Sequence, residues 1–211
     1  MIIVENIEIY GFGGAVKAAR NPMNSWERID SVVVNDIADI GPKDMELLQR
    51  LYKAGVEHRT YARMIYVWMD ITAPLYWWKE ADRYTIGKSQ VSTSTMHKIH
   101  SKEFTLDDFS HEHLGDSEGF SFLRNTINGL NFYRSKYIDT KDKHWWWQMI
   151  QLLPSSYNQL RTVCMSYEVV FKIIKERTGH KLDEWNQFVG ILKALPYVTE
   201  IMGGETVDAS E

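Results

Sequence analysis

The alternation of hydrophobic and polar positions predicts strands in the first third of the chain. Residues 2–10 alternate and are rich in β-branched side chains, which is typical of a strand. A second, short strand is predicted over residues 31–34, after a short helix over residues 15–20 that an Asn-Pro pair breaks. The almost continuous apolar run of residues 63–71 predicts a strand that is buried on both faces.

Helical spacing of apolar residues dominates the rest of the chain. The polar Ser/Thr stretch of residues 88–96 is expected to be a loop that follows Gly87, the expected end of a helix. A few strands followed by a run of helices predict an α+β domain with a small sheet packed with several helices and a helical C-terminal half. The expected helices cover residues 42–54, 74–87, 120–130, 144–153, 160–174 and 182–194.

Length and charge restrict the class of protein. The 211 residues suit one domain, which we expect over residues 1–202, followed by a disordered tail over residues 203–211. The net charge of -4 and the lack of a basic block give general nucleic-acid binding no electrostatic support. The lack of a basic leader and of a membrane-length apolar run, together with a single cysteine, predicts a cytoplasmic protein with no membrane partner.

The segment of residues 73–96 begins Ala-Pro-Leu-Tyr-Trp-Trp-Lys-Glu-Ala-Asp-Arg-Tyr and continues into the Ser/Thr stretch. It resembles the signature of flavin-dependent thymidylate synthases, in which an Ala-Pro pair starts the helix that leads to Arg-His-Arg-x-x-Ser. In that family Asn-Glu-x-Ser-x-Arg-Tyr follows, and an ungapped register can be kept here from about residue 58 to residue 96. The resemblance implies that family's fold, a homotetramer, and FAD-dependent methylation of dUMP with NADPH and methylenetetrahydrofolate as co-substrates.

The same register implies which residues hold the flavin. His58 and Thr60 match the family's Gly-His-x-Ser/Thr, and Arg83 matches the first arginine of the signature. Lys88 stands at the serine and offers a cation to the diphosphate. His180 lies in an echo of the family's second motif, an arginine shortly before His-Ala-Gln-x-Glu. The resemblance thus assigns these five side chains to FAD.

The positions on the nucleotide side have diverged further. Glu80 replaces a glutamine, Thr93 a serine and Thr95 an arginine, while Arg177 matches the arginine of the second motif. Losing two arginine contacts to the dUMP phosphate would weaken binding by roughly 10² to 10⁴-fold, because each charge-assisted hydrogen bond contributes about 1.5 to 3 kcal/mol. These four residues are expected to line the substrate side, and their divergence predicts that the substrate differs.

Three interpretations of function remain open. Residues 21–26 (Asn-Pro-Met-Asn-Ser-Trp) and 76–80 (Tyr-Trp-Trp-Lys-Glu) resemble a divergent subgroup that is typical of phage and prophage genomes. The chain is then a thymidylate synthase-like methyltransferase, a related flavoenzyme in which Glu80 contacts another pyrimidine, or a non-catalytic phage or prophage interaction protein that keeps only the scaffold. No catalytic residue is assigned, because the family chemistry requires no protein nucleophile.

Two further groups of residues have ordinary interpretations. Four histidines and their acidic neighbours are spaced as in a polar turn rather than as metal ligands, so no metal is expected. Cys164 lies in an apolar stripe with no base at catalytic spacing, which predicts a buried thiol. The histidine group comprises His97, His100, His111 and His113, with Asp107, Asp108, Glu112 and Asp116.

Overall fold

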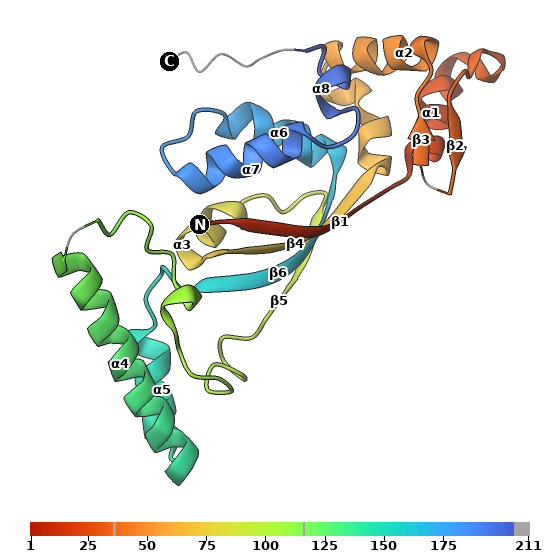
Figure 1. The fold of residues 1–211 in the computed structure, drawn as a ribbon. Coiled ribbons are helices and arrows are strands. Elements are labelled where there is room, and N and C mark those ends of the chain that lie inside the picture. Colours follow the sequence, from red (N-terminus) through yellow and green to blue (C-terminus); the bar gives the residue numbers. More distant parts are fainter. Residues whose placement is uncertain (36, 116, 205–211) are drawn as a thin grey trace. The chain divides into compact units, whose positions relative to one another are not determined.

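The computed structural model describes residues 1–35, 37–115 and 117–204, which form an α+β fold (Figure 1). Residues 205–211 of the expected tail lie outside this part of the chain. In chain order the main elements are β1 (Ile3–Tyr10), α1 (Phe12–Arg20), β2 (Val32–Val34), β3 (Ile37–Asp39), α2 (Pro42–Lys53), β4 (Tyr66–Pro74), α3 (Leu75–Ala81), β5 (Lys88–Ser92), α4 (Ser117–Thr140), α5 (Lys143–Leu152), β6 (Asn158–Ser166), α6 (Tyr167–Arg177), α7 (Asp183–Lys193) and α8 (Val198–Ile201). The short 3-10 helices are η1 (Asn21–Met23), η2 (Trp26–Arg28), η3 (Val56–His58), η4 (Thr60–Met64) and η5 (Leu106–Asp108).

The strands form two sheets. The larger sheet has the strand order β1-β4-β6-β5, so strands distant in sequence are hydrogen-bonded neighbours. The smaller sheet is the antiparallel pair β2 and β3, in which Val33 faces Ala38 across the ladder. None of the helices in the described ranges is long and apolar enough to cross a bilayer.

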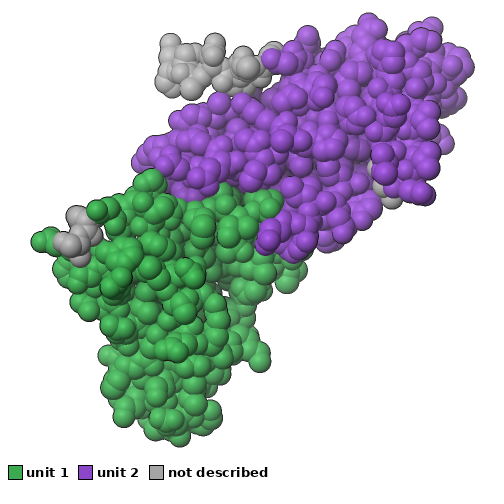
Figure 2. Space-filling view, in the orientation of Figure 1, with its two compact units in different colours: residues 1–4, 71–83, 91–162 green, residues 5–70, 84–90, 163–211 purple. Residues whose placement is uncertain are grey.

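The chain divides into two compact units, coloured separately in Figure 2. Unit 1 comprises residues 1–4, 71–83 and 91–162, and unit 2 comprises residues 5–70, 84–90 and the chain from residue 163 onward.

The core of unit 1 is built where α4 packs against α5, which lie side by side (Figure 1). The turn between them ends at Asp142, whose carboxylate accepts a hydrogen bond from the His144 amide (2.9 Å) and so caps α5. Tyr133 of α4 stacks on Trp145 of α5 with ring centroids 6.0 Å apart. The buried residues of this core are Ile99, Phe104, Phe109, Leu123, Ile127, Leu130 and Met149.

The core of unit 2 is rich in aromatic contacts. The Tyr52 ring of α2 meets the Phe171 ring of α6 edge-on at 5.1 Å, and Phe12 of α1 meets Tyr167 of α6 in the same manner at 5.5 Å. Such pairs contribute about 0.5 to 1.5 kcal/mol beyond the burial of their area. They hold α1 and α2 against α6.

Several of the predicted elements are confirmed. β1, α2, α5 and α7 lie within two residues of their predicted bounds. In α2, Gly41 has extended backbone angles and Pro42 is the first helical residue, as the Gly-Pro pair predicts. The α+β class is correct.

The prediction of a helix over residues 160–174 is wrong in its first half. Residues 160–166 belong to β6, and α6 begins only at Tyr167. Val163 and Met165 are buried at two-residue spacing, as in a strand, while Leu160 is 38% exposed. Because the apolar positions of this strand continue into those of α6, the combined pattern imitates one long helical stripe. Cys164 was expected in a helical stripe, but it lies on the strand β6 and is half-buried.

The prediction for the signature segment is also wrong in two respects. α3 ends at Ala81 rather than at Gly87, and residues 88–92 form β5 rather than a loop. β5 is the strand at the end of the sheet order, beside β6. An edge strand tolerates polar residues because only one side of it is paired, so its sequence lacks the apolar signal of an inner strand.

The strand predicted to be buried on both faces is β4, and this prediction is wrong for its first half. Tyr66 and Trp68 are 41% and 47% exposed, while Val67 and Met69 between them are buried. β4 therefore begins as a half-exposed strand. Residues 60–64 before it form the 3-10 helix η4.

Candidate functional site

Unit 1 carries four of the predicted site residues. Arg83 is exposed in the turn after α3, where its amide donates to the Glu80 carbonyl oxygen (3.2 Å). Glu80 is half-buried near the end of α3, Thr93 is exposed just beyond β5, and Thr95 is half-buried two residues further. The signature thus places an exposed guanidinium at a helix end.

Thr93 is attached to β6 by its backbone and its side chain. Its amide donates to the Leu160 carbonyl oxygen (2.9 Å), and its hydroxyl donates to the same oxygen (3.2 Å). The Thr93 carbonyl oxygen accepts from the buried Gln159 side chain (2.7 Å). These bonds fix the start of the loop that leaves β5.

A cavity of about 530 Å³ opens beside this loop, within unit 1. Thr93 lines it, whereas Glu80, Arg83 and Thr95 do not. Cavities of this size are typical of small-ligand sites. Its lining residues are Thr72, Thr93, Ser94, Lys98, Ile99, Ser101, Lys102, Phe104, Asp107, Asp108, Tyr157, Asn158 and Leu160.

The charges that line this cavity balance. Lys102 forms an ion pair with Asp108, and this hydrogen bond raises the pKa of the lysine. Lys98 and Asp107 supply one further charge of each sign. Burial, with the Asp108 carboxylate beside it, raises the pKa of Tyr157, so this phenol stays protonated. The buried Asn158 side-chain amide nitrogen has no hydrogen-bond partner in the described part of the chain. The cavity therefore suits a polar ligand without a large charge.

The tryptophans of α3 pack inside unit 1. Trp77 and Trp78 are each 1% exposed, and their rings meet edge-on at 4.8 Å. The Trp78 indole donates to the Gln159 carbonyl oxygen (3.0 Å), and the Arg161 guanidinium lies 4.2 Å from its ring centre. Arg161 also pairs with Asp82 (2.7 Å). This pair of indoles positions α3 and the turn that bears Arg83.

Unit 2 carries the other five predicted residues. His58 ends η3, Thr60 begins η4, and both are exposed. The Thr60 hydroxyl is 3.5 Å from the Glu57 carbonyl oxygen, a distance that leaves it weakly held. Lys88 is half-buried at the start of β5.

Arg177 and His180, the remaining two, lie together at the end of α6. Arg177 Nη1 is 3.1 Å from His180 Nε2, and the guanidinium lies 4.5 Å from the ring centre of the buried Trp185. Arg177 Nε donates to the Tyr84 hydroxyl (2.9 Å), which in turn donates to Glu176 (2.9 Å). We call these five residues the arginine cluster.

Tyr84 is a member of this cluster for which the sequence indicated no role. It stands at the histidine of the family signature, is 6% exposed, and links the signature to α6. Burial raises the pKa of Tyr84. The hydrogen bond with Arg177 lowers this pKa and the hydrogen bond with Glu176 raises it, and the net shift is upward. The phenol therefore stays neutral and bridges the arginine and the carboxylate. The three-residue spacing of Arg177 and His180 was the available signal for their proximity, but nothing local indicated Tyr84.

His180 is also held by the backbone. Its Nδ1 accepts a hydrogen bond from the Leu182 amide (3.1 Å), and its Nε2 lies 3.1 Å from Arg177 Nη1. Both ring nitrogens of His180 are thus in contact with neighbouring groups.

The histidine group of residues 97–113 gathers no metal site in the described ranges, where no three His, Cys, Asp or Glu side chains converge. His111 Nδ1 contacts the Phe109 carbonyl oxygen (2.7 Å), and Asp108 caps η5 through a capping box with Thr105. Asp116 lies outside the described residues.

Cys164 lines a shallow cavity in unit 2 with Tyr66 and Trp68. Burial raises the pKa of its thiol, which disfavours a nucleophilic thiolate.

Comparison with known proteins relates this geometry to a fold. No known family profile matches the chain, and no curated protein sequence matches it. Two crystal structures of thymidylate synthase ThyX from Helicobacter pylori, with FAD and dUMP, match with TM-scores of 0.65 and 0.66 at 17% identity. The match covers 95% of this chain and 95% to 96% of theirs.

A third structure extends the comparison to a related activity. The UMP/dUMP methylase PolB from Streptomyces cacaoi, bound with 5-Br dUMP, matches with a TM-score of 0.65 at 14% identity. That match covers 97% of this chain and 95% of the other. The chain has the fold of the flavin-dependent thymidylate synthase ThyX.

Proposed function

We propose that the protein is a flavin- and nucleotide-binding enzyme related to ThyX, which methylates a pyrimidine nucleotide. The observation that carries the proposal is the shared fold over 95% of both chains with ThyX structures that hold FAD and dUMP. The nucleotide ligand of PolB, matched over the same length, supports it. NADPH and methylenetetrahydrofolate are its proposed co-substrates, and a homotetramer its proposed assembly.

The residues assigned to FAD have the chemistry that a diphosphate requires. Arg83, Lys88 and Thr60 are hydrogen-bond donors, two of them cationic, and no carboxylate belongs to the set. Arg83 and Thr60 are exposed, and Arg83 has no ion-pair partner within the part of the chain that the structure describes. His58 is exposed as well, while His180 would contribute from the arginine cluster. When bound, FAD supplies hydride transfer, and the protein supplies binding and orientation.

The nucleotide side differs from the family in a way that changes affinity. Thr93 and Thr95 are neutral, and Glu80 adds a negative charge. The one cation assigned to this side, Arg177, already donates to Tyr84 and lies over Trp185. We therefore propose that dUMP binds weakly and that a pyrimidine nucleotide with an extra donor for Glu80 is preferred.

We further propose that the protein belongs to the phage and prophage type of this fold. The segments of residues 21–26 and 76–80 support this assignment. Trp26 is 46% exposed, and its indole donates to Asn21 (2.8 Å), which holds the first segment in a compact turn. Trp77 and Trp78 are buried, so a role of the second segment in specificity would act through Glu80.

The experiment that tests the proposal is a titration of the purified protein with FAD, followed by flavin fluorescence. Arg83→Gln is compared with Lys79→Gln, which removes an exposed cation one turn earlier on α3. Loss of one charge-assisted bond predicts about tenfold to hundredfold weaker binding for Arg83→Gln and no change for Lys79→Gln. Equal affinities for both variants would show that the signature arginine has no part in flavin binding.

A further inference from the structure

A strongly charged cavity lies in unit 2, and none of the residues assigned above to flavin or nucleotide lines it. It has a volume of about 410 Å³ and is formed by α1, η2 and one face of α2. Four of its lining side chains are cationic, one is a carboxylate and one is apolar. They are Arg20, Arg28, Lys43, Arg50, Glu46 and Leu47.

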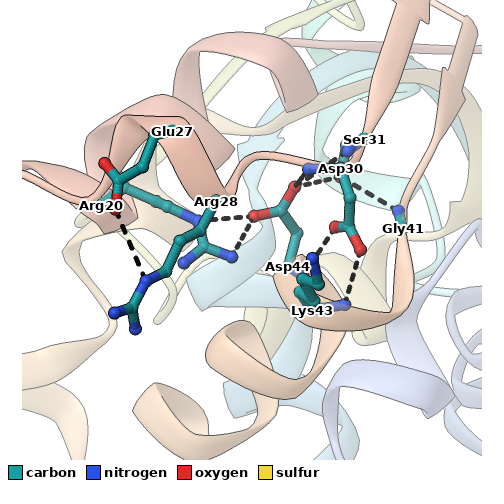
Figure 3. Close-up of polar contacts among 8 residues, drawn as sticks. All are labelled: Arg20, Glu27, Arg28, Asp30, Ser31, Gly41, Lys43 and Asp44. Atoms are coloured by element: carbon teal, nitrogen blue, oxygen red, sulfur yellow. Dashed lines mark hydrogen bonds and ion pairs between the residues drawn. The ribbon is translucent and has the colours of Figure 1, made fainter.

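One of the four cations is neutralised within the fold. Arg20 is 5% exposed and donates from Nε to Asp44 Oδ1 (2.7 Å), while Asp44 is 1% exposed (Figure 3). Arg20 Nη2 lies 2.6 Å from the same oxygen, yet this buried nitrogen makes no hydrogen bond of good geometry within the described residues. A guanidinium carries five N–H donors, so its contacts with Asp44 do not use all of them, and Arg20 is one of the residues that line the cavity.

The other three cations have little compensation. Arg28 Nε is 3.5 Å from Glu27, but both side chains are about 70% exposed, and an ion pair this exposed contributes little. Lys43 and Arg50 have no ion-pair partner among the described residues. Among the described residues that line the cavity, Glu46 is the one carboxylate, so this lining keeps a surplus of positive charge.

The helix aligns these charges. Lys43, Leu47 and Arg50 are spaced four and three residues apart, so they share one face of α2. Two backbone amides at the start of that helix already have acceptors. The Asp30 carboxylate accepts hydrogen bonds from the Lys43 amide (3.0 Å) and from the Asp44 amide (3.1 Å), as Figure 3 shows. Side chains, rather than the helix end, are thus the donors that face the cavity.

We propose that this cavity binds a polyphosphate, either an inorganic one or the phosphate chain of a nucleotide. Three arginines and a lysine match the several charged oxygens of such a chain, since arginine binds phosphate oxygens in a bidentate manner. Leu47 is the one apolar residue in the described lining, which therefore offers little surface to a base. None of the residues assigned above to flavin lines this cavity.

The test is calorimetric binding of tripolyphosphate to the native protein at low ionic strength. Arg28→Gln, Lys43→Gln and Arg50→Gln should each weaken binding by about tenfold or more. Glu46→Gln should tighten it, because it removes the opposing charge. Lys175→Gln, which removes an exposed cation of α6 outside the cavity, should leave it unchanged. Arg20 is not substituted because it holds Asp44, and thermal unfolding of each variant verifies that the fold is intact.

Binding of ATP equal to that of tripolyphosphate would assign the site to the phosphate chain alone, and tighter binding of ATP would identify a nucleotide as its source. Absence of tripolyphosphate binding, or equal losses in Lys175→Gln and the cavity variants, would overturn the proposal. Displacement of tripolyphosphate by a short DNA duplex of higher affinity would also overturn it, because the surface would then bind a nucleic-acid backbone. FAD affinity, measured in parallel, should be the same in all these variants.

Discussion

At the scale of single residues, the Asp44 carboxylate accepts hydrogen bonds from several segments of unit 2. Its oxygens accept hydrogen bonds from Arg20 (2.7 Å), from the Asp30 and Ser31 amides (3.0 Å each) and from the Ser31 hydroxyl (2.7 Å). Burial opposes its ionisation, but these bonds outweigh burial and lower the pKa of the carboxyl below its usual value. Asp44 thereby joins α1, the segment before β2 and α2.

Replacing Asp44 with asparagine should therefore destabilise the protein strongly. The change leaves the buried Arg20 charge without its partner, and breaking a buried pair in this way costs about 3 to 5 kcal/mol. The free energy of unfolding, measured with denaturant, tests this value. Asp39→Asn, at an exposed position of β3, is the matched control and should change it by less than about 0.5 kcal/mol.

The lowered pKa of Asp44 also predicts a dependence on pH. The folded carboxyl has the lower pKa, so its contribution is fully present above the value of about 3.9 for an unfolded aspartate and is lost as the pH falls through the folded pKa. Unfolding free energies of native protein and Asp44→Asn should therefore converge below about pH 4. A constant difference between them across acid pH would contradict this account.

Thr95 is the residue at which the proposed nucleotide site departs most from the ThyX signature. Thr95→Arg restores a guanidinium there, and one charge-assisted hydrogen bond predicts about tenfold to hundredfold tighter binding of dUMP. Ser92→Arg adds the same charge at an exposed position of β5 and separates a specific contact from general attraction. Equal gains for the two variants in a dUMP titration would remove Thr95 from the site.

At the scale of elements, the connection into β5 depends on Gly87. This glycine has a φ of +79°, and an added Cβ would lie 3.0 Å from Ser166 Oγ and 3.1 Å from Val169 Cγ2. Its carbonyl oxygen accepts from the Ser166 amide (2.9 Å), which attaches the start of β5 to the end of β6. Gly87 thus provides the positive φ of the turn that leads into β5.

Two glycine substitutions should act in opposite directions. Gly87→Ala should destabilise by about 1 to 2 kcal/mol, because alanine resists positive φ and the neighbours are close. Gly190→Ala, inside α7 with nothing within 4 Å of the added carbon, should stabilise by about 0.5 to 1 kcal/mol. Thermal unfolding of both variants measures these changes in stability. A shift of the unfolding temperature in the same direction for both variants would contradict the prediction.

Elements with strong local signals were the predictable ones. β1 alternates, α2 has its Gly-Pro start, and α7 is framed by turn residues, so each was located from the sequence. β5 and β6 were missed because their pairing is long-range. The Thr93 amide reaches Leu160, 67 residues later, and no local pattern of polar residues contains that information.

At the scale of the whole molecule, the resemblance of a short signature indicated the fold correctly. The α+β class and the ThyX fold hold over almost the entire chain at 14% to 17% identity. Candidate site residues are less determined by sequence, because a register names positions but not their partners. Arg177 and His180 were assigned to ligands, yet in the structure they contact each other within the arginine cluster. Arg177 also donates to Tyr84, a residue 93 positions earlier that only the fold brings close.

The visible absorption spectrum of the purified protein, recorded before and after addition of FAD and dialysis, tests the central claim most directly. Our account predicts flavin absorbance that survives dialysis and that decreases in Arg83→Gln but not in Lys79→Gln. Addition of a pyrimidine nucleotide should then perturb the spectrum of the bound flavin. A protein that remains colourless after saturation with FAD would contradict the proposed function while leaving the fold unchanged.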